Sequence, residues 1–156
     1  MSHLRPALAL TYAGARAALD AALAHAEQSG GSFNIAVTDT GGALLAFARM
    51  DGAFAASADI AIDKARTVAG FGGAPTDALY AAIESEPAVR DGIAGRTGVA
   101  AFGGGVPILV DGQLVGAVGA SGGTAAQDKA VAEAGARAVT ADPSHSPDRG
   151  DREESA

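Results

Sequence analysis

The sequence predicts an α+β domain in which helices flank an antiparallel five-stranded sheet. Two tight-turn signals carry most of this prediction, DTGG at residues 39–42 and Asp111-Gly112. Aspartate and glycine tolerate the positive φ angles that tight hairpin turns require. Each signal joins two runs of strand-forming residues, and strands joined by tight turns pair antiparallel. No strand–helix–strand repeat is visible, which argues against a parallel α/β architecture.

The first half of the chain predicts helix, strand, strand and helix in that order. Residues 9–28 place alanine and leucine on one face at helical spacing, and Gly30-Gly31 ends this helix. Residues 33–38 and 43–50 are the strands of the first hairpin. Residues 54–71 predict a second helix with a broad apolar arc.

An interrupted region and three strands follow. A short helix begins at Thr76 or Asp77, and Pro87 starts a further helical turn. This region has little potential to form a core, so we expect it to be a wall or lid over a pocket. The remaining strands are predicted at residues 99–102, 106–110 and 113–120.

The last hairpin runs into the last helix. Pro107 cannot donate a ladder hydrogen bond, so its strand should lie at a sheet edge or a bulge. Gly116 and Gly119 inside the next strand predict a close approach by another backbone or a ligand. The sequence TAAQ at residues 124–127 predicts a capping box that opens a helix ending near residue 140.

These elements make a single domain over residues 1–140. Residues 141–156 are polar and charged, and this composition predicts a disordered acidic tail. Much of the expected core is alanine, and only 4% of the residues are aromatic. Because small side chains bury little area each, we expect a homo-oligomer that gains stability by association.

Charge and composition exclude several functions. The formal net charge is −7, with no run of lysine and arginine, so nucleic acid and anionic membranes are not expected partners. The absence of cysteine excludes disulfides, thiolate catalysis and iron–sulfur clusters. No stretch approaches the ~20 apolar residues of a membrane span. The first ten residues lack a signal-peptide pattern, so we expect a cytoplasmic protein.

The strongest candidate for a ligand site is the glycine-rich turn before the last helix. Gly122, Gly123 and Thr124 present backbone N–H groups at a helix start, where anions such as carboxylates bind well. A capped turn without a ligand explains the same residues, and both interpretations stay open. Gly104 and Gly105 lie in the same stretch of the chain, which we expect to form one wall of a pocket.

Three cations are candidates to share that site: Arg49, Lys64 and Arg96. Lys64 falls inside the apolar arc of the second helix. It covers apolar surface with its methylenes, or presents its ammonium to an anionic ligand or a buried carboxylate, or acts in catalysis through a lowered pKa. Arg49 precedes Asp51 by two residues, which indicates either a local ion pair or part of a site.

The candidate metal ligand is His25, at the flank of the apolar stripe of the first helix. A partly exposed helical histidine with no ligand is the alternative. His3 and His145 lie near the termini and are poorly placed for catalysis. No complete catalytic constellation and no metal-ligand spacing is visible.

Five ordered segments together resemble the GlcG/HbpS-like haem-binding family, which also supplies the C-terminal domain of PduO-type proteins. The segments are AVTDTGG (36–42), FARMDGA (47–53), SADIAIDKA (57–65), GGGVPI (103–108) and VGASGGTAAQD (118–128). The resemblance covers roughly residues 8–140. It implies a profilin-like antiparallel sheet flanked by helices, homo-oligomers, and haem binding or haem degradation in some members. If haem binds, we expect His25 to be the axial ligand, because it is the histidine that lies nearest the expected core, with Lys64 or Arg49 pairing a propionate.

Three functional hypotheses follow from these observations. The first is a protein that binds or handles haem, or a similar anionic ligand. The second is an enzyme acting on a small carboxylated metabolite, in which Arg49 and the glycine-rich helix start hold the carboxylate and Lys64 or Asp51 does acid–base work. The third is a non-catalytic oligomeric accessory protein whose glycines serve close packing. Whether the chain is an enzyme stays open.

Overall fold

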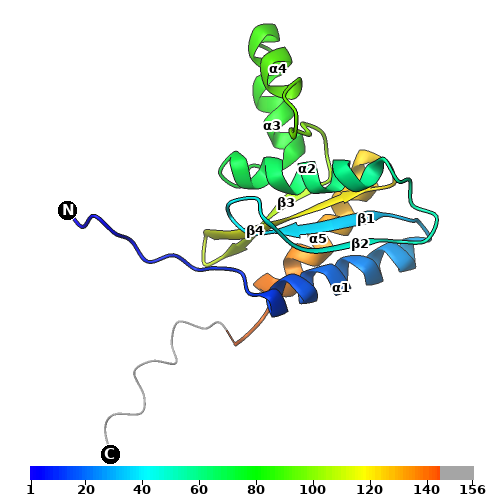
Figure 1. Cartoon of the computed structure of the whole chain (residues 1–156), viewed down its shortest axis with the longest axis horizontal. Coiled ribbons are helices and arrows are strands. Elements are labelled where there is room, and N and C mark those ends of the chain that lie inside the picture. Colours follow the sequence, from blue (N-terminus) through cyan, green and yellow to red (C-terminus); the bar gives the residue numbers. More distant parts are fainter. Residues whose placement is uncertain (145–156) are drawn as a thin grey trace, which may run out of the picture.

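A computed structural model describes residues 1–144 of the chain, and it confirms the predicted α+β class (Figure 1). Within this range there are five helices and four strands. Their order is α1 (Tyr12–Ser29), β1 (Asn34–Thr38), β2 (Leu44–Arg49), α2 (Ser57–Gly70), α3 (Thr76–Ile83), α4 (Pro87–Ala94), β3 (Gly105–Val110), β4 (Gln113–Ser121) and α5 (Ala125–Thr140).

The four described strands form one antiparallel sheet in the order β2-β1-β4-β3. The two predicted hairpins, β1–β2 and β3–β4, join through pairing of β1 with β4. Strand β3 lies at an edge, and its ladder is irregular between Ile108 and Leu109, as Pro107 predicts. Asp111 and Gly112 both take positive φ in the turn that joins β3 to β4.

The prediction of a fifth strand at residues 99–102 is wrong. This segment is a loop, because its backbone bonds to a helix and not to a strand. The Ala100 N–H donates to the Thr67 hydroxyl of α2 at 2.9 Å. Ala100 and Ala101 are both buried, so apolar residues in this run reflect packing against helices and not pairing in the sheet.

Helices cover both faces of the sheet (Figure 1). Helices α1 and α5 pack together on one face, and α2 packs on the other. Small side chains make these contacts close. A Cβ placed on Gly119 of β4 would lie 2.0 Å from the Ala61 carbonyl oxygen of α2, and one on Gly135 of α5 would lie 2.8 Å from the Ala18 carbonyl oxygen of α1. The close approach predicted at Gly119 is therefore confirmed.

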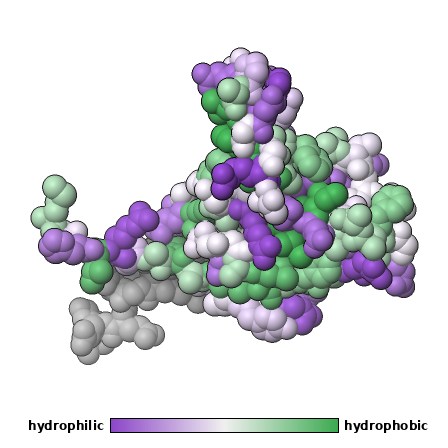
Figure 2. Space-filling model, turned by 45° about the horizontal axis from the view of Figure 1, so that its top comes forward, coloured by the Kyte–Doolittle hydropathy of each residue, from purple (hydrophilic) through white to green (hydrophobic). Residues whose placement is uncertain are grey.

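Helices α3 and α4 form an arm that stands away from the sheet (Figure 1). A small apolar cluster joins the arm to the body through Leu79, Ile83 and Ala101, and α4 has no buried residue. A Lys129–Asp77 ion pair at 2.6 Å ties α3 to α5. Figure 2 shows the arm protruding, with apolar and polar residues intermixed on the body beneath it.

The capping box predicted at the last helix is confirmed. The Gln127 N–H donates to the Thr124 hydroxyl, and the Gln127 side chain accepts from the Thr124 N–H. The helix ends at Thr140, as predicted. Of the predicted disordered tail, residues 145–156 lie outside the described residues. Among residues 1–144, no helix is long and apolar enough to cross a membrane.

Candidate functional site

Segments far apart in the sequence meet at one end of the sheet. Asn34, the first residue of β1, lies opposite Arg49 at the end of β2 and opposite Ser121 at the end of β4. Helices α2 and α5 begin shortly after β2 and β4 respectively, so both helix starts lie at this end as well. The predicted site residues are therefore drawn to one end of the domain.

Lys64 is fully buried at the centre of this end. Its ammonium donates to the Asp128 carboxylate at 2.7 Å and to the Ala120 carbonyl oxygen at 2.9 Å. The ring of Phe102 covers it, with the centroid 4.6 Å from Nζ. Because Lys64 belongs to α2 and Asp128 to α5, this ion pair links helices that lie on opposite faces of the sheet.

Asp128 also occupies the helix start that was predicted to bind an anion. Its Oδ1 accepts the backbone N–H groups of Gly122 and Gly123 at 3.0 and 2.9 Å. A carboxylate is favoured there because the free N–H groups and the helix dipole give the start of α5 a partial positive charge. The anion at this position is thus supplied by the chain itself.

The glycines of residues 103–105 allow the backbone to pass close to Lys64. Gly104 has φ of +129°, and a Cβ on it would lie 2.6 Å from Lys64 Nζ. A Cβ on Gly105 would lie 2.7 Å from the Lys64 carbonyl oxygen, and the Gly105 N–H donates to the Thr76 hydroxyl at 3.0 Å. In this structure both glycines enclose the lysine and do not line an open cavity.

Arg49 and Asp51 lie outside this enclosed centre, and both are exposed. Arg49 is on the sheet face that α2 covers, since it lies opposite Asn34, which shares that face with Ala36. Arg96 follows α4 and is exposed at the base of the arm. The structure therefore joins Lys64 to the glycine-rich turn but leaves the other two predicted cations at the surface.

His25 is half-buried on α1. The two helices are antiparallel, because α1 ends where β1 begins and α5 begins where β4 ends. Gly135 packs against Ala18. His25 lies about two turns after Ala18, so it faces residues about two turns before Gly135, around Asp128.

Sequence reasoning missed the residues that complete this end of the domain. Asp128 was not recognised as the partner of Lys64, although an acidic residue in the first helical turn after two glycines is a usable signal. Asn34 and Phe102 gave no sequence signal, because strand-end asparagines and loop phenylalanines are common. Within residues 1–144, no group of three or more His, Cys, Asp or Glu could hold a metal ion.

Burial lowers the pKa of Lys64 below its ordinary value of 10.5, and the hydrogen bond and charge of Asp128 offset part of this shift. Between the folded-state pKa and 10.5 the unfolded chain binds more protons than the folded chain, so Lys64 makes the free energy of unfolding rise with pH in that window.

We expect Lys64→Met to lose this rise of stability with pH. Denaturant titrations from about pH 8 to about pH 10 measure the free energy of unfolding of both proteins. If the difference in this free energy between the unmodified protein and Lys64→Met is constant over that range, the pKa of Lys64 is not lowered by folding.

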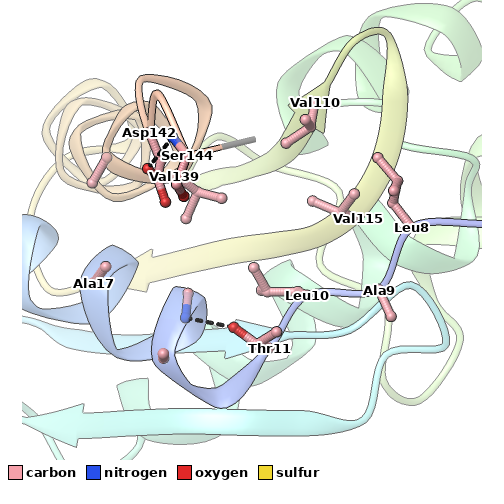
Figure 3. Close-up of a pocket in the computed structure, with 13 residues that line it drawn as sticks. Leu8, Ala9, Leu10, Thr11, Ala17, Val110, Val115, Val139, Asp142 and Ser144 are labelled. Atoms are coloured by element: carbon pink, nitrogen blue, oxygen red, sulfur yellow. Dashed lines mark hydrogen bonds between the residues drawn. The ribbon is translucent and has the colours of Figure 1, made fainter. Parts of the chain in front are cut away.

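A cavity of about 440 Å³ lies at the opposite end of the domain (Figure 3). Apolar side chains from the N-terminal segment, the start of α1, the β3–β4 hairpin and the end of α5 point into it. It contains no histidine, lysine or arginine and none of the predicted site residues. Its lining is Leu8, Ala9, Leu10, Thr11, Ala13, Gly14, Ala17, Val110, Val115, Ala138, Val139, Asp142 and Ser144.

The structure is that of a small α+β protein with helices on both faces of one sheet. The buried Lys64–Asp128 ion pair connects the two helical layers. Residues 10–137 match the family model described as haem degrading protein HbpS-like. The chain belongs to the HbpS-like family. The resemblance inferred from the five sequence segments is thereby confirmed.

Curated and solved relatives agree with this assignment. The chain is 38% identical over 113 residues to protein GlcG of Escherichia coli K12, covering 69% of this chain and 77% of GlcG. The crystal structure of Klebsiella pneumoniae protein ORFY superposes with a TM-score of 0.82 at 29% identity, over 90% of this chain and 97% of ORFY. A solved PduOC:heme complex superposes with a TM-score of 0.76 at 28% identity, over 84% and 95%.

Proposed function

We propose that this chain is a haem-binding accessory protein. The observation that carries the proposal is its membership of a family described as haem-degrading. It is supported by similarity over most of the chain to a protein solved with haem bound. Haem, when bound, supplies an iron centre whose axial ligand and surroundings set its chemistry.

His25 is the candidate axial ligand in this proposal. Haem iron takes His, Cys, Met or Tyr from proteins, and the chain has no cysteine. The Met50 sulfur accepts the Phe33 N–H at 3.4 Å, and the Tyr12 hydroxyl accepts from Arg16. The His25 imidazole is half-buried and makes no hydrogen bond with another described residue.

Arg49 is more accessible than Lys64, but it lies on the sheet face that α2 covers whereas His25 lies on α1 on the other face, so neither cation is assigned to a haem propionate. The Lys64 ammonium is enclosed by Asp128, the Ala120 carbonyl oxygen and Phe102. Arg49 is exposed and forms no ion pair with any residue between 1 and 144. The 440 Å³ cavity is a poor haem site, because its lining has neither an axial ligand nor a cation.

The proposal includes a homo-oligomer as the working form. Several large apolar side chains are exposed in the single chain, and contacts between copies are a natural way to cover them. They include Leu44, Phe54, Phe71, Tyr80 and Phe102. Location in the cytoplasm stays a prediction from the sequence.

Titration with haemin tests the proposal, with variants that separate a specific ligand from surface adsorption. We expect a saturable shift of the Soret absorption at micromolar haemin. His25→Ala should abolish the shift, because the iron loses its axial ligand. His3→Ala, which changes an exposed histidine near the N-terminus, is the matched control and should leave it unchanged.

Two outcomes contradict the proposal. One is the absence of a saturable shift in the unmodified protein. The other is a shift that His25→Ala and His3→Ala affect equally. Circular dichroism of both variants establishes that each is folded before its titration is interpreted.

A small-metabolite enzyme using Lys64 or Asp51 stays the alternative proposal. The contacts of Lys64 favour a structural role, because its hydrogen bonds go to Asp128 and Ala120 and its access is closed by Phe102. In a non-catalytic accessory protein, the third hypothesis, Lys64 would have the same structural role. Loss of stability in Lys64 variants, measured apart from turnover, distinguishes the structural role from the catalytic one.

A further inference from the structure

A row of three polar side chains crosses the sheet at the end described above. Asn34 of β1 lies directly opposite Arg49 of β2 on one side and Ser121 of β4 on the other. Residues opposite one another in an antiparallel pair point to the same face. That face is the one covered by α2, because Ala36, two residues along β1, packs against Ala61 and Ala65.

Asn34 carries a buried acceptor that has no donor. Its side chain is 0% exposed, and its amide nitrogen donates to the Phe54 carbonyl oxygen at 2.9 Å. A carbonyl oxygen only accepts, so this bond fixes the orientation of the amide. Asn34 Oδ1 then has no hydrogen-bond partner in the described part of the chain. Buried acceptors are nearly always paired, so a donor is missing here.

The surroundings of this acceptor favour an anion. Arg49 is exposed and pairs with no carboxylate in residues 1–144. Helix α2 begins at Ser57, three residues after Phe54, and its N-cap, Ala56, supplies no capping side chain. The partial positive charge at this helix start therefore adds to that of Arg49.

We propose that this row binds a small carboxylate that carries a hydroxyl group close to the carboxylate. The Arg49 guanidinium takes the carboxylate, and the ligand hydroxyl donates to Asn34 Oδ1. Ser121, which is 5% exposed, adds a hydroxyl on the far side of Asn34. Neighbouring strands lie about 4.8 Å apart, and this spacing selects a short hydroxy acid.

Access requires movement of residues 51–56, which cross this end of the sheet. The segment contains a turn at Gly52, with φ of +82°, and Phe54 is 71% exposed. The Phe54 carbonyl oxygen of this segment accepts the hydrogen bond from the Asn34 amide. The site is independent of haem and of His25, which lies on the opposite face, so it is tested without haemin.

Lactate and propionate are the probes, since they differ by one hydroxyl group. Calorimetric titration of the full chain should show lactate binding about tenfold more tightly than propionate, because only lactate supplies the missing donor. Arg49→Gln should abolish binding of both. Arg16→Gln, which changes an exposed arginine of α1, is the matched control and should change neither.

Asn34→Ala should remove the preference for lactate while leaving weak binding of both acids. If Asn34→Ala does not fold, the affinities of lactate and propionate for the unmodified protein and for Arg49→Gln still test the proposal. Equal binding of lactate and propionate, no binding of either, or binding that survives Arg49→Gln overturns the proposal. The missing donor is then a buried water.

Discussion

Replacing Asp128 by alanine should lower the free energy of unfolding by about 3–5 kcal/mol. The substitution leaves the fully buried Lys64 ammonium without its counter-ion. It also leaves the N–H groups of Gly122 and Gly123 without their acceptor. Removing one partner of a buried ion pair is among the most destabilising single changes, because the remaining charge stays desolvated. Urea denaturation followed by circular dichroism measures the loss.

Two further variants divide this loss into its parts. Asp128→Asn keeps an oxygen that can accept from Gly122 and Gly123 but removes the charge that faces Lys64. Lys64→Met removes the cation and leaves Asp128 with its two N–H donors, so it should cost less than Asp128→Ala. If Asp128→Ala costs under about 1 kcal/mol, the pair is not the link between the two helical layers.

Gly119→Ala should destabilise the fold by more than about 4 kcal/mol, or prevent soluble expression. A Cβ on Gly119 would lie 2.0 Å from the Ala61 carbonyl oxygen and 2.7 Å from the Ala65 nitrogen. Both are backbone atoms of α2, so no side-chain rotation relieves the overlap. Helix α2 would have to move away from the sheet, and its contacts with β1, β3 and β4 would weaken together.

Gly92→Ala is the matched control for this experiment. Gly92 lies in α4, and a Cβ there meets nothing within 4 Å. Alanine has a higher helix propensity than glycine, so this variant should be unchanged or more stable by up to about 1 kcal/mol. Similar losses in Gly119→Ala and Gly92→Ala would mean that the helix does not approach the strand as described.

The sequence was sufficient for those parts of the fold that local chemistry determines. Asp111-Gly112 specifies its hairpin because only such residues accept the positive φ of the turn. The pair Thr124 and Gln127 specifies the start of α5 because each side chain satisfies the other's backbone N–H. In both cases the residues that decide the structure are neighbours in the chain.

Features that depend on distant contacts were not predictable in the same way. The apolar run at residues 99–102 resembles a strand, but a hydroxyl on α2, that of Thr67, takes the backbone N–H of Ala100. Lys64 in an apolar arc indicated a buried partner, but Asp128 lies 64 positions further along the chain, so the sequence did not show that it is the partner. The unpaired oxygen of Asn34 emerges only once three strands are aligned.

The central claim is that the chain holds haem through His25. A crystal structure of the haemin-soaked or co-crystallised protein tests it most directly, because anomalous scattering at the iron edge locates the metal independently of the phases of the protein. We expect one iron peak per chain, bonded to a ring nitrogen of His25. Iron bonded to another residue, or no iron peak in a protein that is otherwise folded as described, contradicts it.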